Sequence, residues 1–427
     1  MNMRLTCFSH RWLNQVAHAL VRAVSRLVST PWWHTDTLSS PSVGMSAGAA
    51  RTSACATPSP PNVCEKCRLV ISILFATLFA TLAWAGAPEM PQFRWENFTT
   101  ENGLPDNHVF QVKVDGNRVW AATENGLALY QNGRWKVYGT ADGLAHRAVL
   151  FVDVDPRTGD VWAATMGGLS RFSAGRFDNY TQLNSGLPND VVYGVAVQGD
   201  AVWVATAAGG GRLDIKTGQW RHFNERNTPM YEIWTYAVTA GAEKVYYAVW
   251  GGGVLEYDVK TGRWKDYNDP DGETEVVVLK DQGLIHEITT SVSWAEKDHV
   301  LWVATYFGAS RYDGRYWKNF LDKDSGLPSN FLNQVKAVDG TRAWFATDKG
   351  LAYYDGASWA VYRPALDSHA PEMTVRDAQG AITHVPTATA PAHNYILGLD
   401  FDGDDLWVAT AHGLSHGIRI KKKETGK

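Results

Sequence analysis

From about residue 93 onward, short apolar segments alternate with polar turns that contain glycine. The first set predicts four strands at about 109–114, 119–123, 127–131 and 135–138. Segments of this length, bounded by Gly, Asn and Asp, are typical of antiparallel strands. The same order of apolar and polar positions recurs along the chain, which indicates a repeat architecture.

The clearest mark of the repeat is an apolar strand that begins with Trp and ends in Ala-Thr. A degenerate copy at Tyr247–Trp250 brings the set to seven, and successive copies lie 41 to 63 residues apart. The complete copies are Trp120–Thr123, Trp162–Thr165, Trp203–Thr206, Trp302–Thr305, Trp344–Thr347 and Trp407–Thr410. A period in the low forties with four strands per repeat predicts an all-β fold, a seven-bladed β-propeller.

A second mark, aromatic-x-x-aromatic, also occurs seven times and belongs to the fourth strand of each blade. The chain begins with such a pair, Trp95–Phe98, and its last strand, about Leu414–Ile420, is followed by none. The N-terminal strand should therefore complete the last blade, which closes the ring and hides two strand edges. The recurring Trp and Tyr rings are expected to fill the space between blades.

Residues 66–85 have the pattern of a secretory signal. Lys66 and Arg68 precede the uncharged apolar run Leu69–Ala85, which ends in Ala-Trp-Ala. Basic flank, apolar core and small-residue site together predict cleavage after Ala85 and export to the periplasm or beyond in a bacterium. The alternative is an uncleaved membrane anchor, because the run is just long enough to span a bilayer.

Residues 1–65 fit no export rule, and we interpret them as a start codon assigned too early or a disordered leader. All four Cys lie before the predicted cleavage site, so residues 86–427, the predicted propeller domain, have no thiol chemistry. The chain holds 40 Lys and Arg against 44 Asp and Glu. That balance argues against a nucleic-acid partner. No apolar span follows residue 87, so the mature chain should not cross a membrane.

The repeat resembles a known family. Aromatic-x-x-aromatic, Gly-Leu-Pro (as at Gly103–Pro105, Gly186–Pro188 and Gly326–Pro328), an apolar strand and Trp-Val-Ala-Thr resemble the two-component regulator propeller repeat. The resemblance covers about residues 93–420. It implies a seven-bladed propeller used as an extracytoplasmic sensor of hybrid histidine kinases. Because no kinase-like segment follows in this sequence, we expect a detached module that passes its signal to another protein.

Candidate site residues come from the loops that share one face of a propeller, those from the fourth strand to the next blade and from the second strand to the third. Every loop that enters a first strand carries a polar pair. The pairs are Asp106-Asn107, His146-Arg147, Asn189-Asp190, Tyr231-Glu232, His286-Glu287, Ser329-Asn330 and His393-Asn394. These groups either cap turns or form a polar ring that binds a ligand over the channel mouth.

The second-to-third-strand loops add His412 and the aromatic residues Trp250, Tyr306 and Phe307. Such rings suit a ligand or protein hot spot, or else packing between blades. The candidate binding residues are Asn107, Arg147, Asp190, Glu232, Trp250, Glu287, Tyr306, Asn330, His393, Asn394 and His412. A long insertion at 363–391 predicts a small hairpin, 374–377 with 381–384, on the same face as a lid or docking element.

The leading interpretation is an exported, non-catalytic propeller that binds a small polar ligand or a partner protein, as a sensor or assembly module. The alternative is a lyase or hydrolase, because propellers of the virginiamycin-lyase type can carry such a site. Its candidate acid–base groups are His146, Glu232, His286 and Glu287. No metal site is assigned, and no cofactor is predicted: the turns Asp214–Trp220 and Asp258–Trp264 resemble quinoprotein turns in only two copies.

Overall fold

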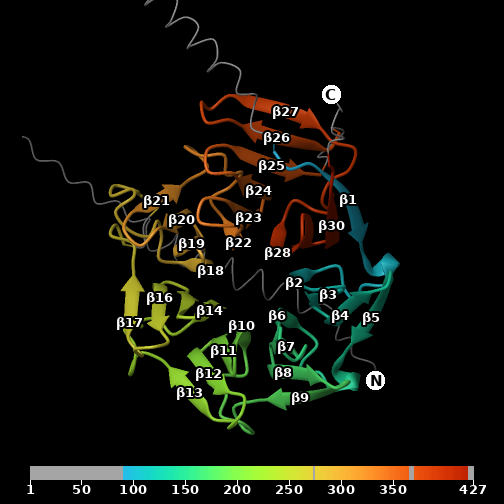
Figure 1. Cartoon of the computed structure of the whole chain (residues 1–427), viewed down its shortest axis with the longest axis vertical. Coiled ribbons are helices and arrows are strands. Elements are labelled where there is room, and N and C mark those ends of the chain that lie inside the picture. Colours follow the sequence, from blue (N-terminus) through green and yellow to red (C-terminus); the bar gives the residue numbers. More distant parts are fainter. Residues whose placement is uncertain (1–89, 273–274, 365–369, 422–427) are drawn as a thin grey trace, which may run out of the picture. The chain divides into compact units, whose positions relative to one another are not determined.

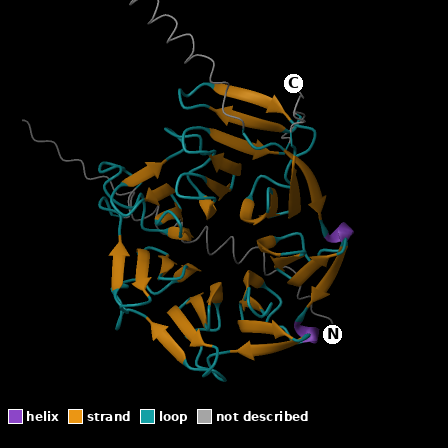
Figure 2. Cartoon of the chain, in the orientation of Figure 1, coloured by secondary structure: helices purple, strands orange, loops and turns teal. Residues whose placement is uncertain are grey.

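The computed structural model describes residues 90–272, 275–364 and 370–421. Within these ranges the chain forms seven antiparallel sheets in a ring, as predicted (Figure 1), and almost no helix (Figure 2). The predicted signal peptide and leader lie outside the described residues. No helix in the described ranges is long and apolar enough to cross a membrane.

Each blade runs from an inner strand a through b and c to an outer strand d. Blade 1 is β2 (Val109–Asp115), β3 (Arg118–Thr123), β4 (Gly126–Gln131) and β5 (Arg134–Tyr138). Blade 2 is β6 (Val149–Val154), β7 (Val161–Thr165), β8 (Gly168–Ser173) and β9 (Arg176–Tyr180). Blade 3 is β10 (Val192–Gln198), β11 (Ala201–Thr206), β12 (Gly209–Asp214) and β13 (Trp220–Phe223). Blade 4 is β14 (Thr235–Ala240), β15 (Lys244–Val249), β16 (Gly253–Asp258) and β17 (Trp264–Tyr267). Blade 5 is β18 (Thr289–Ala295), β19 (Val300–Thr305), β20 (Gly308–Tyr312) and β21 (Trp317–Phe320).

Blades 6 and 7 depart from this plan at their outer strands. Blade 6 is β22 (Leu332–Ala337), β23 (Ala343–Thr347), β24 (Gly350–Tyr354), β25 (Trp359–Arg363), β26 (Glu372–Arg376) and β27 (Ile382–Pro386). Blade 7 is β28 (Ile396–Asp402), β29 (Asp405–Thr410), β30 (Gly413–Arg419) and, from the other end of the chain, β1 (Phe93–Phe98). Single-turn 3-10 helices, η1 (Thr100–Asn102) and η2 (Thr140–Asp142), follow β1 and β5.

The N-terminal strand closes the ring, as the order of the marks predicted. β1 pairs antiparallel with β30, with Trp95 opposite Gly417. Phe93 and Trp95 are buried in a cluster with Trp344 and Tyr362 of blade 6. The backbone N–H of Trp95 also donates to Thr389 Oγ1 at 2.7 Å. Strand pairing, burial and this hydrogen bond therefore join the two ends of the described chain, the hydrogen bond across 294 positions.

The Ala-Thr strand end and the glycine after it form one local device. In blade 1 the Thr123 hydroxyl donates to the Gly126 carbonyl at 2.8 Å. Gly126 has a φ of +125°, and a Cβ there would lie 2.8 Å from the Tyr138 carbonyl oxygen of strand d. Only glycine accepts both conditions without strain. In blade 4, which has Val249 in place of Thr, the hydroxyl of Thr289 from blade 5 donates to the Gly253 carbonyl instead.

The Trp residues of the b strands lie between blades, as expected. Trp120, Trp162, Trp203 and Trp302 are fully buried. Trp203, for example, stacks on Phe223 of its own blade at 5.9 Å between ring centroids and contacts Tyr257 of blade 4 at 5.5 Å. Aromatic pairs of this geometry add about 0.5–1.5 kcal/mol each beyond the area they bury.

The predicted hairpin in the long insertion exists, but its expected position was wrong. β26 pairs along its length with β25, so β26 and β27 extend blade 6 to six strands at the rim of the ring (Figure 1). Met373 is buried against the cluster that holds Phe93 and Trp95. The hairpin is not a lid over the channel, because its apolar face has a better partner in the ring closure.

Candidate functional site at the channel mouth

The loops after strands b and d meet at one end of the ring, which we call the mouth. In six blades of the described structure, the glycine that begins strand c donates its N–H to a carbonyl on the loop that enters the next blade. The pairs are Gly126–Arg147, Gly168–Asp190, Gly209–Ile233, Gly253–Glu287, Gly308–Asn330 and Gly413–Asn107. The two sets of loops therefore share one face, as the sequence predicted.

The first member of each predicted polar pair mostly caps strand a. In six blades its side chain accepts a hydrogen bond from the backbone N–H two residues later. The acceptors are Asp106, His146, Asn189, His286, Ser329 and His393, at 2.8 to 3.2 Å. This is the turn-capping geometry that Asx and Ser side chains adopt, with the imidazole Nδ1 in the acceptor role at three positions.

The capping bonds limit what the three His can do. A ring nitrogen that accepts a backbone N–H is unprotonated, so His146, His286 and His393 carry their proton on Nε2 and offer no free acceptor nitrogen. Burial lowers the pKa of His286 to about 4. Burial, then the nearby His412, lowers the pKa of His393. In this arrangement each of the three imidazoles presents an Nε2–H donor.

The second members of the pairs divide into two groups. Asn107, Asp190 and Asn330 accept the backbone N–H of Thr100, Gln182 and Asp322 at 2.7 to 2.8 Å, and thereby fix the turn that follows strand d. The others are Arg147, which donates to the Glu124 carbonyl at 3.5 Å, Glu287, which accepts from the Tyr231 hydroxyl, and the exposed Glu232 and half-buried Asn394. Turn formation therefore accounts for three of the seven.

The candidate catalytic residues come from three of the mouth loops. His146 belongs to the loop that enters blade 2, Glu232 to blade 4, and His286 and Glu287 to blade 5. His286 contacts the rings of Tyr306 and Phe307, at centroid distances of 6.3 and 6.1 Å. In the described ranges, no group of three His, Cys, Asp or Glu could hold a metal ion.

Half-buried aromatic side chains form a continuous arc at the mouth, from blade 3 to blade 7. Trp250 and Tyr306, which the sequence singled out, lie at its centre. Neighbouring ring centroids are 5.2 to 6.5 Å apart. The members of this aromatic arc are Tyr193, Trp234, Tyr236, Trp250, Tyr306, Phe331 and Tyr395.

Sequence reasoning missed five of these seven residues. In every blade the pairing of strands a and b is interrupted by a bulge at the second residue of strand a. A bulge redirects its side chain, and Tyr193 and Tyr236 occupy it in blades 3 and 4. Trp234, Phe331 and Tyr395 lie just before strand a. Aligning the seven first strands would have placed aromatic residues at recurrent positions, but not the bulge that turns them.

Two phenols of the arc are neutral donors, and two unpaired acceptors lie on the neighbouring blades. Burial raises the pKa of Tyr193 and of Tyr395 to about 12, so both phenols stay protonated. Asp348 Oδ1 and Asn394 Oδ1, from blades 6 and 7, are buried and accept no hydrogen bond from any described residue. A buried acceptor without a donor is uncommon in proteins and is satisfied when a donor arrives.

Below the mouth, the inner strands enclose a central cavity of about 440 Å³ with charged groups on one side. Lys113 Nζ lies 2.8 Å from Asp153, and Lys336 Nζ lies 2.8 Å from Asp400. We call these four residues the charged wall. Burial alone would raise the pKa of Asp400, but attraction to Lys336 and Lys113 outweighs it and lowers that pKa. The wall therefore links blades 6, 7, 1 and 2.

Comparison with family models and with curated proteins finds no match. Solved structures do match in fold. The extracellular domain of a hybrid two-component system from B. thetaiotaomicron aligns with a TM-score of 0.56 and 18% identity, over 77% of this chain and 40% of that one. A streptogramin B lyase aligns at 0.55 and 16%, over 77% and 98%.

The virginiamycin B lyase of Staphylococcus aureus aligns with a TM-score of 0.54 and 13% identity, over 78% of this chain and all of that one. The present chain spans about two fifths of the two-component domain and nearly the whole of each lyase. At these identities the likeness establishes the propeller fold. It does not choose between sensing and catalysis, because one fold carries many functions.

Proposed function

We propose that this chain is an exported, non-catalytic propeller that binds a ligand or partner protein at the channel mouth, as a detached sensor or assembly module. The aromatic arc carries the proposal. Its rings stay half-buried although the blades below them are already packed, so they offer apolar area that the fold itself does not need.

The arrangement of the mouth describes the molecule that would fit it. The arc presents half-buried rings from blade 3 to blade 7, whereas the unpaired Asp348 Oδ1 and Asn394 Oδ1 are buried on blades 6 and 7 and reach a ligand only after a side-chain movement. We expect a ligand with an apolar or planar part and at least one hydrogen-bond donor. Ligand sites commonly combine an apolar lining with a few such polar groups.

Three observations support an exported binding protein. The basic, apolar and small-residue pattern at 66–85 predicts secretion. An extracellular two-component domain shares the fold, which is compatible with a sensor, although the lyases share it too. The candidate catalytic residues are spread over three loops, with only His286 and Glu287 on the same one, and the capping bonds of His146 and His286 occupy the nitrogen that a general base would need.

The test is capture of the tagged protein from the periplasm of its own host, followed by mass spectrometry of what co-purifies. Trp250→Ala and Tyr306→Ala should lose the captured molecule. Tyr316→Ala, which removes an aromatic ring that is 61% exposed on the opposite face, should keep it. Equal capture by all three variants would refute binding at the mouth, and turnover of the captured compound would favour the lyase or hydrolase alternative.

A further inference from the structure

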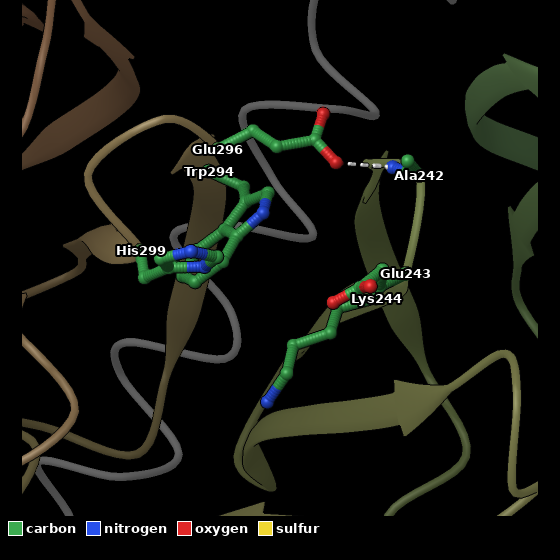
Figure 3. A pocket seen from close by; sticks show the side chains of 6 residues that line it. All are labelled: Ala242, Glu243, Lys244, Trp294, Glu296 and His299. Carbon is green, nitrogen blue, oxygen red and sulfur yellow. Dashed lines mark hydrogen bonds between the residues drawn. The ribbon is translucent and has the colours of Figure 1, made fainter.

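A second pocket lies on the opposite face of the ring, between blades 4 and 5. It has a volume of about 210 Å³, and Figure 3 shows Trp294, Glu296 and His299 on one side and Ala242, Glu243 and Lys244 on the other. The first group belongs to the end of β18 and its turn, the second to the turn into β15. The pocket is therefore formed by a-to-b turns, far from the aromatic arc.

Blade 5 departs from the repeat where it forms this pocket. Trp294 occupies the sixth position of strand a, which holds Val or Ala in most other blades, such as Val114 and Ala337. The turn after it spans 296–299, within the range of the other a-to-b turns, so the departure lies in the side chain at position 294. His299 has a φ of +54°, and its ring lies 5.9 Å from that of Trp294 between centroids. A non-glycine residue rarely adopts this conformation without a local reason.

The charges of the pocket are predominantly negative. Glu296 Oε1 accepts the backbone N–H of Ala242 at 2.6 Å, which fixes this carboxylate across the gap (Figure 3). The Glu243 carboxylate makes no hydrogen bond or ion pair with any described residue. Lys244 is neutralised by its ion pair with Glu256. Two carboxylates thus remain uncompensated beside an indole.

We propose that this pocket binds a small organic cation with an alkylammonium head group. An ammonium ion is attracted to the negative face of a Trp ring, by about 0.5–2 kcal/mol depending on desolvation. The Glu243 and Glu296 carboxylates add Coulombic attraction at the rim. The head group is small enough for the 210 Å³ volume. This site does not depend on the function proposed for the mouth.

Calorimetric titration of the purified protein with choline, at low ionic strength, tests the proposal. The control ligand is 3,3-dimethylbutan-1-ol, which has the same shape without the charge. We expect choline to bind at least tenfold more tightly than the alcohol. Equal affinities, or no binding by choline, would overturn the proposal, because its basis is charge rather than apolar area.

Variants locate the binding. Glu243→Gln, which alters only an exposed side chain, and Trp294→Leu should each weaken choline binding about tenfold. Glu225→Gln, at an exposed glutamate on the mouth face, should leave it unchanged, as should Trp250→Ala in the arc. Unaltered affinity in both Glu243→Gln and Trp294→Leu would refute the site. A lysine-containing peptide, titrated in parallel, distinguishes the side chain of a partner protein from a free ammonium compound by binding more tightly than choline.

Discussion

The charged wall lies on the inner strands, whereas the aromatic arc lies at their mouth ends and on neighbouring loops. The wall uses the fifth residue of strand a: Lys113, Asp153, Lys336 and Asp400. Their ion pairs run between blades, on either side of the point where the two chain ends meet. The arc uses positions at and before the strand-a bulge, together with Trp250 and Tyr306, which follow strand b in blades 4 and 5. Its members contact one another and leave part of each ring accessible.

The difference shows which side chains the ring itself requires. Blades 3 to 5 have Ala196, Thr239 and Ser293 at the wall position, so charge there is not a condition of the fold. The ion pairs concentrate where the ring must close non-covalently. The aromatic residues gather mostly on the blades that chain connectivity already holds together. We infer that the wall stabilises the closure, and that the arc is available for binding.

The largest effect should come from removing the closure itself. Deletion through residue 100, which removes β1, exposes the edge of β30 and the cluster around Tyr362. We expect aggregation and no cooperative melting by calorimetry, since an exposed edge strand pairs with other chains. The milder Trp95→Ala should cost about 3–5 kcal/mol of unfolding free energy. A truncated protein that melts like the full chain would disprove closure by β1.

The next effect should come from the charged wall. Asp400→Asn keeps an acceptor for the Val114 N–H but leaves Lys336 without its counter-charge. We expect a loss of roughly 2–4 kcal/mol at pH 7 in urea unfolding. Asp153→Asn is the matched variant, since Asp153 also accepts a backbone N–H, from Val197. It should cost less, because Asp153 has one lysine partner whereas Lys336 and Lys113 both attract Asp400, and because its side chain is more exposed, 17% against 10%. The reverse order would contradict the role given to Asp400.

The wall also predicts a pH dependence. The pKa of Asp400 is lower in the folded state than in the unfolded chain, so its stabilisation is fully present above the unfolded value of about 3.8. It is lost as the pH falls through the lower folded value. Below pH 4 the stabilities of wild type and Asp400→Asn should therefore converge in acid titrations of unfolding. A constant difference down to pH 2 would contradict this origin.

At the mouth, His286 should make the stability of the fold sensitive to acid at a higher pH than Asp400 does. His286 has a pKa of about 4 when folded, against 6.5 in the unfolded chain, so acid favours the unfolded state as the pH falls from 6.5 towards 4. The shift corresponds to about 3 kcal/mol near pH 4. His286→Asn keeps a capping acceptor, as Asn189 does in blade 3. It should match wild type at pH 7.5 and exceed it at pH 4.5 in thermal melts.

The smallest effect on stability should come from the arc. Trp250→Leu removes ring contacts with Trp234, Tyr236 and Tyr306 but leaves the wall and the closure intact. We expect a loss of about 1–2 kcal/mol in unfolding free energy, with binding at the mouth abolished. A loss as large as that of Asp400→Asn would mean that the arc serves packing rather than binding.

The fold could be predicted from the sequence because the repeat is local. Strand length, the Trp-to-Thr mark and the glycine after it are conditions within one blade, and each is met by residues fewer than twenty positions apart, as in Thr123 and Gly126. The role of β1 followed from the aromatic-x-x-aromatic pair that stands before the first blade and is missing after the last strand. The hairpin around Gly380 was predicted, but its place beside β25 depended on an apolar partner, Phe93, from the opposite end of the chain.

The candidate site was less predictable for the same reason. A His at the start of strand a has the same appearance in sequence whether it caps a turn or holds a proton for catalysis. The capping role of His286 follows from its hydrogen bond with the N–H of Ile288 and from its burial near Tyr306. The bulge that turns Tyr193 and Tyr236 towards one another is a property of paired strands.

The sequence by itself determined the number of blades, the strand order within each blade and the closure, since hydrogen-bonding periodicity and turn chemistry are local. Only the tertiary structure decided which polar groups are consumed by capping, which charges meet across blades and which rings remain accessible. Those outcomes depend on distances between residues 40 to 300 positions apart, as for Lys113 with Asp400. The periodic pattern of apolar and polar residues in a sequence does not specify those distances.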